Sequence, residues 1–320
     1  MSAVHLSSHE EYARLIDQYD TWMFDCDGVL WHGDRLIPGA TEVLSLLRGK
    51  KKKVIFVTNN ATKSRKSYKG KFDNLGVEAS VVRPLFNTTA GGRFSNFTIR
   101  QDEIYGSAYA AAVYISSVMK LPKNKKVYVI GQSGLEEELR DEGISFVGGT
   151  DPADCTVSPF SLESFTLDPD VGAVVCGLDT AINYTKVSKA FQYLTRNPGC
   201  QFIATNEDST YPAAHGLLPG AGAISAPLRY ALGKDPIAIG KPAKTMLDCI
   251  KAKVHFDPKR TIMVGDRLNT DILFGQAGGV STLLVLTGIT LASEISGPNP
   301  SLIVPDYVTS SIADLAVVSK

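Results

Sequence analysis

Short apolar runs that end abruptly in polar residues constrain most strongly what this chain can fold into. Residues 22–24, 54–57, 236–239 and 261–264 are runs of this kind. Runs this short and this apolar are typical of strands buried on both faces of a parallel sheet. Because helical patterns lie between the runs, the sequence predicts an α/β protein with mostly parallel sheets.

The rest of the chain continues this alternation. We expect further strands at residues 125–130, 171–176, 202–205 and 282–286, with a last strand and helix within 306–317. Helical patterns cover residues 6–20, 38–47, 62–75, 102–119, 131–143, 185–194, 221–232 and 244–254. The basic residues of 62–75 (Lys63, Arg65, Lys66, Lys69 and Lys71) indicate a solvated face. Residues 83–101 have no helical period and predict a long loop.

Length, charge and cysteine usage limit the class of protein. A chain of 320 residues favours two domains, and 33 basic residues balanced by 33 acidic ones give no bulk attraction to nucleic acid or anionic lipid. No apolar run approaches the roughly 20 residues that span a bilayer, and residues 1–20 lack the pattern of a signal peptide. Five scattered cysteines indicate free thiols in a reducing compartment, so we expect a cytoplasmic protein.

The first apolar run is followed by two carboxylates, Asp25 and Asp27, and then by Gly28. Alternate side chains of an extended chain share a face, so both carboxylates would point into one space and Cys26 would face away. Carboxylates held so close repel each other unless a cation or proton lies between them, and Mg²⁺ prefers oxygen ligands. An acidic turn without chemistry is the plainer alternative for this motif alone.

Three other apolar runs also end in polar chemistry. Thr58, Asn59 and Asn60 follow the second, Lys241 the third, and Asp266 with Asp271 the fourth. In a parallel sheet the carboxyl ends of the strands share one edge, where ligands bind. Together these residues supply carboxylates for a metal, donors for an oxyanion and one cation, which is the set that phosphoryl transfer requires.

The ordered motifs resemble those of the haloacid dehalogenase-like (HAD) phosphohydrolase superfamily. The matching residues are DxDG at 25–28, Thr58, GKP at 240–242 and GDRLNTD at 265–271. The resemblance implies that Asp25 is the nucleophile and Asp27 the general acid/base. It implies phosphoryl binding by Thr58, Asn59 and Asn60, and charge stabilisation by Lys241. Mg²⁺ would be held by Asp25, the backbone carbonyl of Asp27 and Asp266, while Asp271 would orient the acidic loop.

A finer resemblance is to the eukaryotic para-nitrophenyl phosphatase, phosphoglycolate phosphatase and pyridoxal phosphatase branch. DCDGVLWHG, FVTNN, ATNEDSTYP and MVGDRLNTDILFG carry it. It implies a doubly wound, Rossmann-like parallel-sheet core at residues 1–117 and 236–320, with a smaller α/β cap domain inserted at 118–235. Relatives are often homodimers through the cap, but the sequence shows no interface of its own.

The activity implied is Mg²⁺-dependent hydrolysis of small phosphomonoesters such as 2-phosphoglycolate, through an aspartyl-phosphate on Asp25. Two departures stand out. Animal members of the branch carry a His where this chain has Ala181, which puts pyridoxal phosphate in doubt and makes the chain resemble fungal-type relatives. Residues 83–101 also form an extra stretch. The alternatives are a pyridoxal or protein phosphatase of the same family, and a HAD-fold regulatory protein without turnover.

Weaker signals have plainer interpretations. Gly131 and Gly134 flank a turn that resembles a dinucleotide-binding turn, but the spacing of a third glycine is missing, so a simple turn is favoured. Cys26 is interpreted as a packing residue, because neighbouring carboxylates make a thiol a poor nucleophile. Asn206 and Asp208 are candidates for a position near the site.

Overall fold

A computed structural model describes residues 3–75, 103–157, 159–213 and 216–319. The chain divides into two compact units. The first comprises Met1–Val57, Lys66–Ile104 and Phe256–Lys320, and the second comprises Thr58–Arg65 and Tyr105–His255. The loop expected at 83–101 lies outside the described residues.

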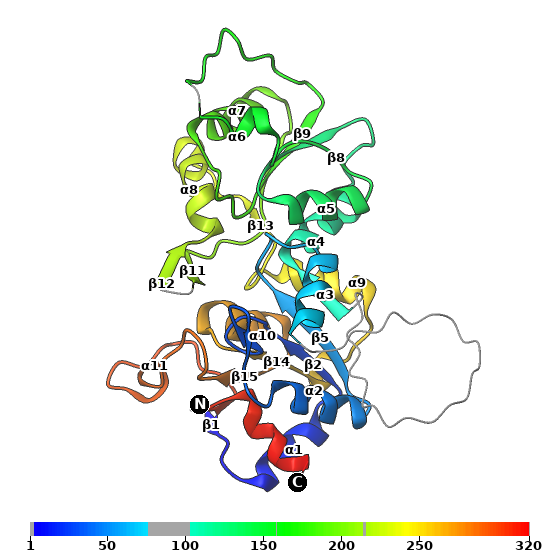
Figure 1. Ribbon diagram of the computed structural model, residues 1–320, viewed down its shortest axis with the longest axis vertical. Helices are drawn as coiled ribbons and strands as arrows, with labels where there is room; N and C mark the ends of the chain where they lie inside the picture. The colour runs from blue at the N-terminus through cyan, green and yellow to red at the C-terminus, as the bar shows by residue number, and fades with distance from the viewer. Residues whose placement is uncertain (1–2, 76–102, 158, 214–215, 320) are drawn as a thin grey trace, which may run out of the picture. The chain divides into compact units, whose positions relative to one another are not determined.

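Most strands of a seven-stranded sheet lie in the first unit (Figure 1). From β1 to β5 every neighbouring pair of strands runs parallel. Its strands, in spatial order, are β1 (Val4–His5), β16 (Tyr307–Thr309), β15 (Ser281–Val285), β14 (Thr261–Gly265), β2 (Thr21–Phe24), β5 (Lys53–Thr58) and β6 (Ile104–Gly106).

Alternation along the central strands of this sheet forms the main core of the first unit. Successive side chains of a strand point to opposite faces. Positions 22 and 24, 54 and 56, and 262 and 264 therefore share one face. All six side chains belong to one buried cluster with Ile16 of α1 (His9–Gln18) and Val43 of α2 (Ala40–Gly49). The helix α1 begins at His9 rather than at residue 6 because Ser8 and Glu11 form a capping box.

Outside this sheet, the described residues of the first unit form a hairpin and several helices. They are the hairpin β3 (Trp31–His32) and β4 (Arg35–Leu36), and the helices α1 (His9–Gln18), α2 (Ala40–Gly49), α3 (Arg65–Asn74), α10 (Leu273–Gly278) and α11 (Ser293–Ser296). Short 3₁₀ or π turns cover Pro258–Arg260, Leu268–Ile272 and Ile312–Ser319.

The second unit has a five-stranded sheet of its own, again with parallel pairing throughout. The spatial order is β13 (Ile237–Ala238), β10 (Gln201–Ala204), β9 (Val171–Cys176), β7 (Lys126–Ile130) and β8 (Ser145–Gly148). Figure 1 shows α7 (Tyr184–Arg196) and α8 (Ala221–Leu232) on one side of this sheet and α5 (Ser133–Asp141) on the other. The chain thus reverses its winding direction between β7 and β9.

The remaining elements of the second unit are one hairpin and several helices. They are β11 (Thr210–Ala213), β12 (Gly216–Pro219), α4 (Ser107–Val113), α6 (Pro152–Cys155), α9 (Lys244–Lys253) and a π-helical turn at Tyr114–Val118. In the described ranges no helix combines the length and apolar character needed to cross a lipid bilayer.

The α/β prediction with mostly parallel sheets is confirmed. The helix expected at 102–119 is wrong at its start, since Ile104–Gly106 is a strand and α4 begins only at Ser107. β8 and the β11–β12 hairpin were not expected, because short segments without a strong apolar run carry little pattern. The domain limits at 118 and 235 stay a prediction; the sheet of the second unit itself runs from Lys126 to Ala238.

Candidate active site

Asp25 stands directly after the central strand β2. Phe24 pairs with Val264 of β14 on one side and with Phe56 of β5 on the other. The backbone N–H of Asp25 still donates to Val264 O at 2.9 Å, so the sheet fixes the start of the loop that carries both aspartates. This register brings the carboxyl end of β2 level with the end of β14, where Asp266 follows Gly265.

Asp266 is buried and held by the backbone around it. Its Oδ2 accepts a hydrogen bond from the Ile289 N–H at 2.7 Å, and its carbonyl accepts one from the Thr290 N–H at 3.0 Å. Gly28 has φ +84°, and a Cβ there would lie 2.6 Å from Asp266 Oδ2. Glycine is therefore required at position 28 both by the left-handed turn and by the approach of the carboxylate.

Asp271 lies on the turn Leu268–Ile272 and is 1% exposed. Its Oδ2 accepts from the backbone N–H groups of Asp266 at 3.2 Å and Arg267 at 3.1 Å. These bonds give Asp271 the loop-orienting contacts that the resemblance implied.

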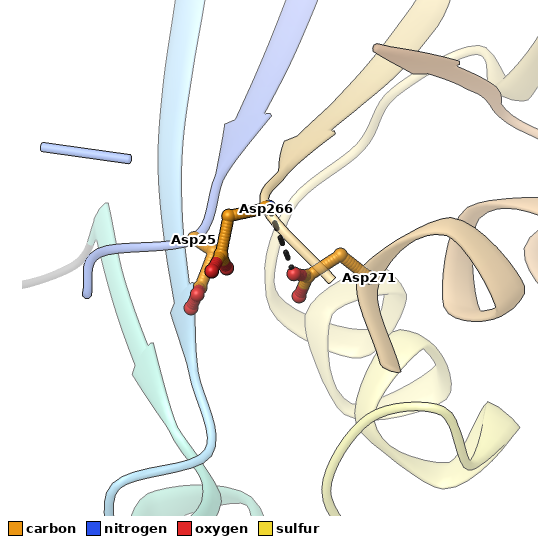
Figure 2. A group of neighbouring side chains, drawn as sticks. All are labelled: Asp25, Asp266 and Asp271. Atoms are coloured by element: carbon orange, nitrogen blue, oxygen red, sulfur yellow. Dashed lines mark hydrogen bonds between the residues drawn. The ribbon is translucent and has the colours of Figure 1, made fainter. Parts of the chain in front are cut away.

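Three carboxylates converge at this edge of the sheet. One oxygen from each of Asp25, Asp266 and Asp271 lies within 4.8 Å of the others. Figure 2 shows the side chains of Asp25 and Asp266 next to each other, with Asp271 on the far side of Asp266. Like charges this close repel one another unless a cation lies between them. An all-oxygen set of this kind fits a hard divalent cation, so the donor set meets the expectation of a metal centre.

Asp27 points to a different set of partners. Its Oδ1 accepts a hydrogen bond from the Trp31 indole N–H at 2.8 Å and lies 3.9 Å from the Lys71 ammonium. Sequence reasoning missed both partners. Tyr68 and Phe72 mark the buried stripe of α3, and Lys71 is adjacent on that stripe, which is the signal that was available.

The charge pattern of residues 62–75 predicted a solvated face, but not all of their basic side chains are solvated. The Lys71 side chain is only 12% exposed. The guanidinium of Arg65 bonds to Glu138 at 2.8 Å and lies 3.5 Å from the centre of the Tyr109 ring. Buried partners that are distant in sequence override the preference of such a run for water.

Thr58, Asn59 and Asn60 follow one another at the end of β5, and the structure groups them with the second unit. Thr58 Oγ1 accepts from the Asn60 N–H at 3.2 Å, and Asn60 Oδ1 accepts from the N–H and hydroxyl of Thr62 at 3.0 and 2.7 Å. These local bonds form a tight turn that precedes the helix α3.

Asn59 and Lys241 are brought together within the second unit. The Asn59 side chain donates to Lys241 O at 2.9 Å and accepts from Lys241 N–H at 2.8 Å. It also donates to Asp208 at 3.1 Å, while Asn206 donates to Asn59 O at 2.7 Å. The amide of Asn59 thus acts as a clamp on the backbone of Lys241, and both weaker candidates, Asn206 and Asp208, contact Asn59.

A second aspartate-containing strand end lies in the second unit. Asp179 follows β9, and its Oδ2 is 2.7 Å from the ammonium of Lys186, whose side chain is 0% exposed. Lys186 also donates to Gly149 O at 2.9 Å, and Asp179 Oδ1 accepts from the Ala181 N–H at 2.8 Å. The pair ties the loops after β8 and β9 to the helix α7, and Ala181 is part of that loop.

The turn at Gly131–Gly134 has a packing explanation. A Cβ at Gly134 would lie 2.5 Å from the Lys63 backbone. Glycine is therefore needed where α5 passes close to residues 62–63, which supports the simple turn over a nucleotide-binding one.

The five cysteines form no disulfide, and four of them are buried. Burial raises the pKa of Cys200 to about 12 and that of Cys249 to about 11. Cys26 is part of the first unit's core, which agrees with its interpretation as a packing residue.

Comparisons with known proteins agree with this geometry. Residues 22–145 match the model of the haloacid dehalogenase-like hydrolase family, and residues 238–315 match a second HAD-hydrolase-like model. The chain is 44% identical to the 4-nitrophenylphosphatase of Schizosaccharomyces pombe, over 98% of this chain and 99% of that protein. It is 43% identical to phosphoglycolate phosphatase 2 of Arabidopsis thaliana, over 98% and 97% of the two chains.

A solved structure shares the fold. The glycerol phosphate phosphatase of Mycobacterium tuberculosis, crystallised in complex with calcium, superposes with a TM-score of 0.72 at 28% identity, covering 94% of this chain and 76% of that one. The predicted resemblance is thereby confirmed, and this chain belongs to the haloacid dehalogenase-like hydrolases, as an enzyme of their phosphatase branch.

Proposed function

We propose that this protein is a Mg²⁺-dependent phosphatase that hydrolyses small phosphomonoesters through an aspartyl-phosphate on Asp25. The convergence of Asp25, Asp266 and Asp271 at the carboxyl ends of β2 and β14 is the observation that supports the proposal most directly. The metal would be held by Asp25, Asp266 and the backbone carbonyl of Asp27. Bound there, Mg²⁺ would neutralise carboxylate charge and polarise the phosphoryl group.

The aspartates divide the chemistry between them. A carboxylate oxygen of Asp25 attacks phosphorus, the bond from phosphorus to the ester oxygen breaks, and Asp27 donates a proton to that oxygen. Asp27 then takes a proton from water as the water oxygen attacks phosphorus, which releases phosphate and restores Asp25. Asp271 acts through the loop, because its carboxylate holds the backbone of Asp266 and Arg267.

Thr58, Asn59, Asn60 and Lys241 are proposed to bind the transferring phosphoryl group. Thr58 ends β5, the neighbour of β2 in the sheet, which supports its assignment. The Asn59 side chain is engaged by Lys241 and Asp208, so we assign phosphoryl contact to its backbone N–H and give its amide the task of holding Lys241.

The substrate class is proposed from the relatives. Their names indicate 4-nitrophenyl phosphate, phosphoglycolate and glycerol phosphate, which share one small phosphomonoester group. We propose 2-phosphoglycolate-like metabolites as substrates and a cytoplasmic location, to which the five free thiols are suited. A homodimer through the residues of 118–235 remains part of the proposal.

The test is a steady-state screen of purified protein with Mg²⁺ against 4-nitrophenyl phosphate, 2-phosphoglycolate, glycerol phosphate, pyridoxal phosphate and a phosphotyrosine peptide. Asp25→Asn serves as the blank. Preference for 2-phosphoglycolate or glycerol phosphate supports the proposal. Preference for pyridoxal phosphate or the peptide would transfer the assignment to those substrate classes, and absence of turnover from folded protein would favour a regulatory HAD-fold protein.

A further inference from the structure

We infer that Trp31 and Lys71 are positioning residues that hold the carboxyl group of Asp27 in one orientation for proton transfer. The inference rests on the proposed role of Asp27 as general acid/base. Neither side chain is suggested to touch the substrate; both act through Asp27.

The indole of Trp31 is a rigid hydrogen-bond donor. Trp31 is 0% exposed, and its Nε1–H donates to Asp27 Oδ1 at 2.8 Å. The Phe72 ring meets the indole edge to face at a centroid distance of 4.9 Å, and the Tyr68 ring stacks on it at 6.4 Å. An indole enclosed in this way cannot rotate, so the direction of its N–H is fixed.

Lys71 adds a second contact from the same helix. Its ammonium lies 4.3 Å from the centre of the Trp31 ring and 3.9 Å from Asp27 Oδ1. Tyr68, Lys71 and Phe72 share one side of α3, so a single helix both supports the indole and places a cation beside the carboxylate. A cation above an indole face is itself attracted to the ring, which keeps Lys71 in this place.

Both contacts are made to Oδ1, and this distinguishes orientation from simple burial. The Asp27 side chain is 35% exposed and would otherwise rotate about its terminal bond. With Oδ1 engaged by Trp31 and Lys71, Oδ2 is the oxygen left for the reacting proton. The loop reinforces the arrangement, because the Gly28 N–H donates to Trp31 O at 2.8 Å. Correct orientation of such a group removes much of the entropic cost of proton transfer.

The test separates the steps that need Asp27 from the one that does not. Nitrophenolate leaves without a proton, whereas an alkoxide leaving group and the attacking water both need proton transfer. Trp31→Phe keeps an aromatic ring but removes the N–H donor. We expect its nitrophenol burst rate to stay within roughly threefold of the unaltered enzyme, while phosphoenzyme hydrolysis and single-turnover cleavage of glycerol phosphate slow by roughly 10–100-fold.

Phe72→Leu is the matched packing control, since it loosens the support of the indole without removing a donor to Asp27. It should lower the melting temperature and should change the ratio of burst rate to hydrolysis rate less than Trp31→Phe does, because the indole N–H still donates to Asp27. Lys71→Met should show the same split as Trp31→Phe with a smaller amplitude, and it decides the matter if Trp31→Phe does not fold. Lys71→Arg, which keeps the charge, should recover most of the rate.

Unchanged rates for all steps in Trp31→Phe, or in Lys71→Met where only that variant folds, would overturn the inference. An equal slowing of all steps would also overturn it, because that result indicates a structural role. Failure of the underlying function looks different. In that case Asp27→Asn would retain both proton-dependent steps, or the unaltered enzyme would form no phosphoenzyme.

Discussion

Each unit has an aspartate after the strand at the same topological position, but the charges that surround the two aspartates have opposite signs. In the first unit Asp266 follows β14 and lies with Asp25 and Asp271 in a cluster of like charges. In the second unit Asp179 follows β9 and is neutralised by Lys186 at 2.7 Å. The first arrangement calls for an added cation, and the second is complete within the chain.

An aspartate in the loop after a parallel strand therefore does not by itself mark catalysis. What separates the two positions is the sign of the neighbouring charge. Clustered carboxylates store repulsion that a metal can relieve, whereas a buried ion pair with further hydrogen bonds holds loops together. Replacing an aspartate should therefore damage activity in the first unit and stability in the second.

Asp25→Asn should give the largest effect. The change is nearly isosteric and removes the nucleophile, so kcat should fall by at least roughly 10⁴-fold. The melting temperature should stay the same or rise in the absence of metal, because one like charge is lost. Steady-state assays with 4-nitrophenyl phosphate and circular dichroism on the same sample measure both. Retention of full turnover would show that another group attacks phosphorus.

Asp179→Asn should reverse this pattern. It leaves the buried Lys186 ammonium without its counter-charge, which costs about 3–5 kcal/mol of the free energy of unfolding. For a unit of this size the melting temperature should fall by about 6–20 °C. Asp179→Asn combined with Lys186→Met should recover most of the loss, since no buried charge remains. If the single variant melts like the unaltered protein, the ion pair is not what holds these loops.

Metal binding should have a smaller effect on stability than Asp179→Asn, and this effect should depend on the carboxylates of the first unit. EDTA should abolish turnover, and Mg²⁺ should restore it. Mg²⁺ at a hundred times its Kd should stabilise the folded protein by about 2.7 kcal/mol. Asp266→Asn should lose most of that gain, while Asp179→Asn should keep it. Thermal unfolding over a Mg²⁺ titration measures both, and activity that persists in chelator would rule out the metal centre.

Thiol reactivity should give the smallest signal. Burial raises the pKa of Cys249 to about 11 and of Cys200 to about 12, so at pH 8 almost none of either is the reactive thiolate. Raising the pH toward these values should increase their labelling. Mass spectrometry after brief alkylation at pH 8 should find Cys155 as the main labelled residue.

In Asp179→Asn, Cys176 and Cys200 should become labelled before Cys26, and the opposite order would place the weakened region in the first unit.

Sequence patterns were sufficient for the elements that carry strong apolar runs. The strand expected at 171–176 and the helix expected at 221–232 have the same bounds in the structure, because each contains enough apolar residues to define its period. The convergence of Asp25 with Asp266 also follows from the parallel-sheet rule, and the structure brings their oxygens together. Local patterns are sufficient where one element decides the outcome.

Contacts between distant elements were beyond that reasoning. Nothing near Lys71 in the sequence identifies Asp27 as its partner. Likewise, the sequence around Asn59 does not indicate that its side-chain amide bonds to the backbone of Lys241. A weak signal in the sequence indicated that Lys186 is buried, because this lysine lies in a helix beside the apolar residues Val187, Ala190 and Tyr193. Such charges are buried only because a partner from another segment meets them, and a single sequence does not reveal that partner.

The late position of β14 has a consequence for biosynthesis. β2 pairs with β5, which leaves the ribosome soon after it, but its other neighbour follows roughly 240 residues later. At about 5–20 residues per second, that edge of β2 stays open for the order of 10–50 s. During that time the nascent chain exposes an apolar strand edge that is open to incorrect pairing, and it cannot assemble the carboxylate cluster until Asp266 has emerged. The order of strands in the sheet thus delays activity until most of the chain has been made.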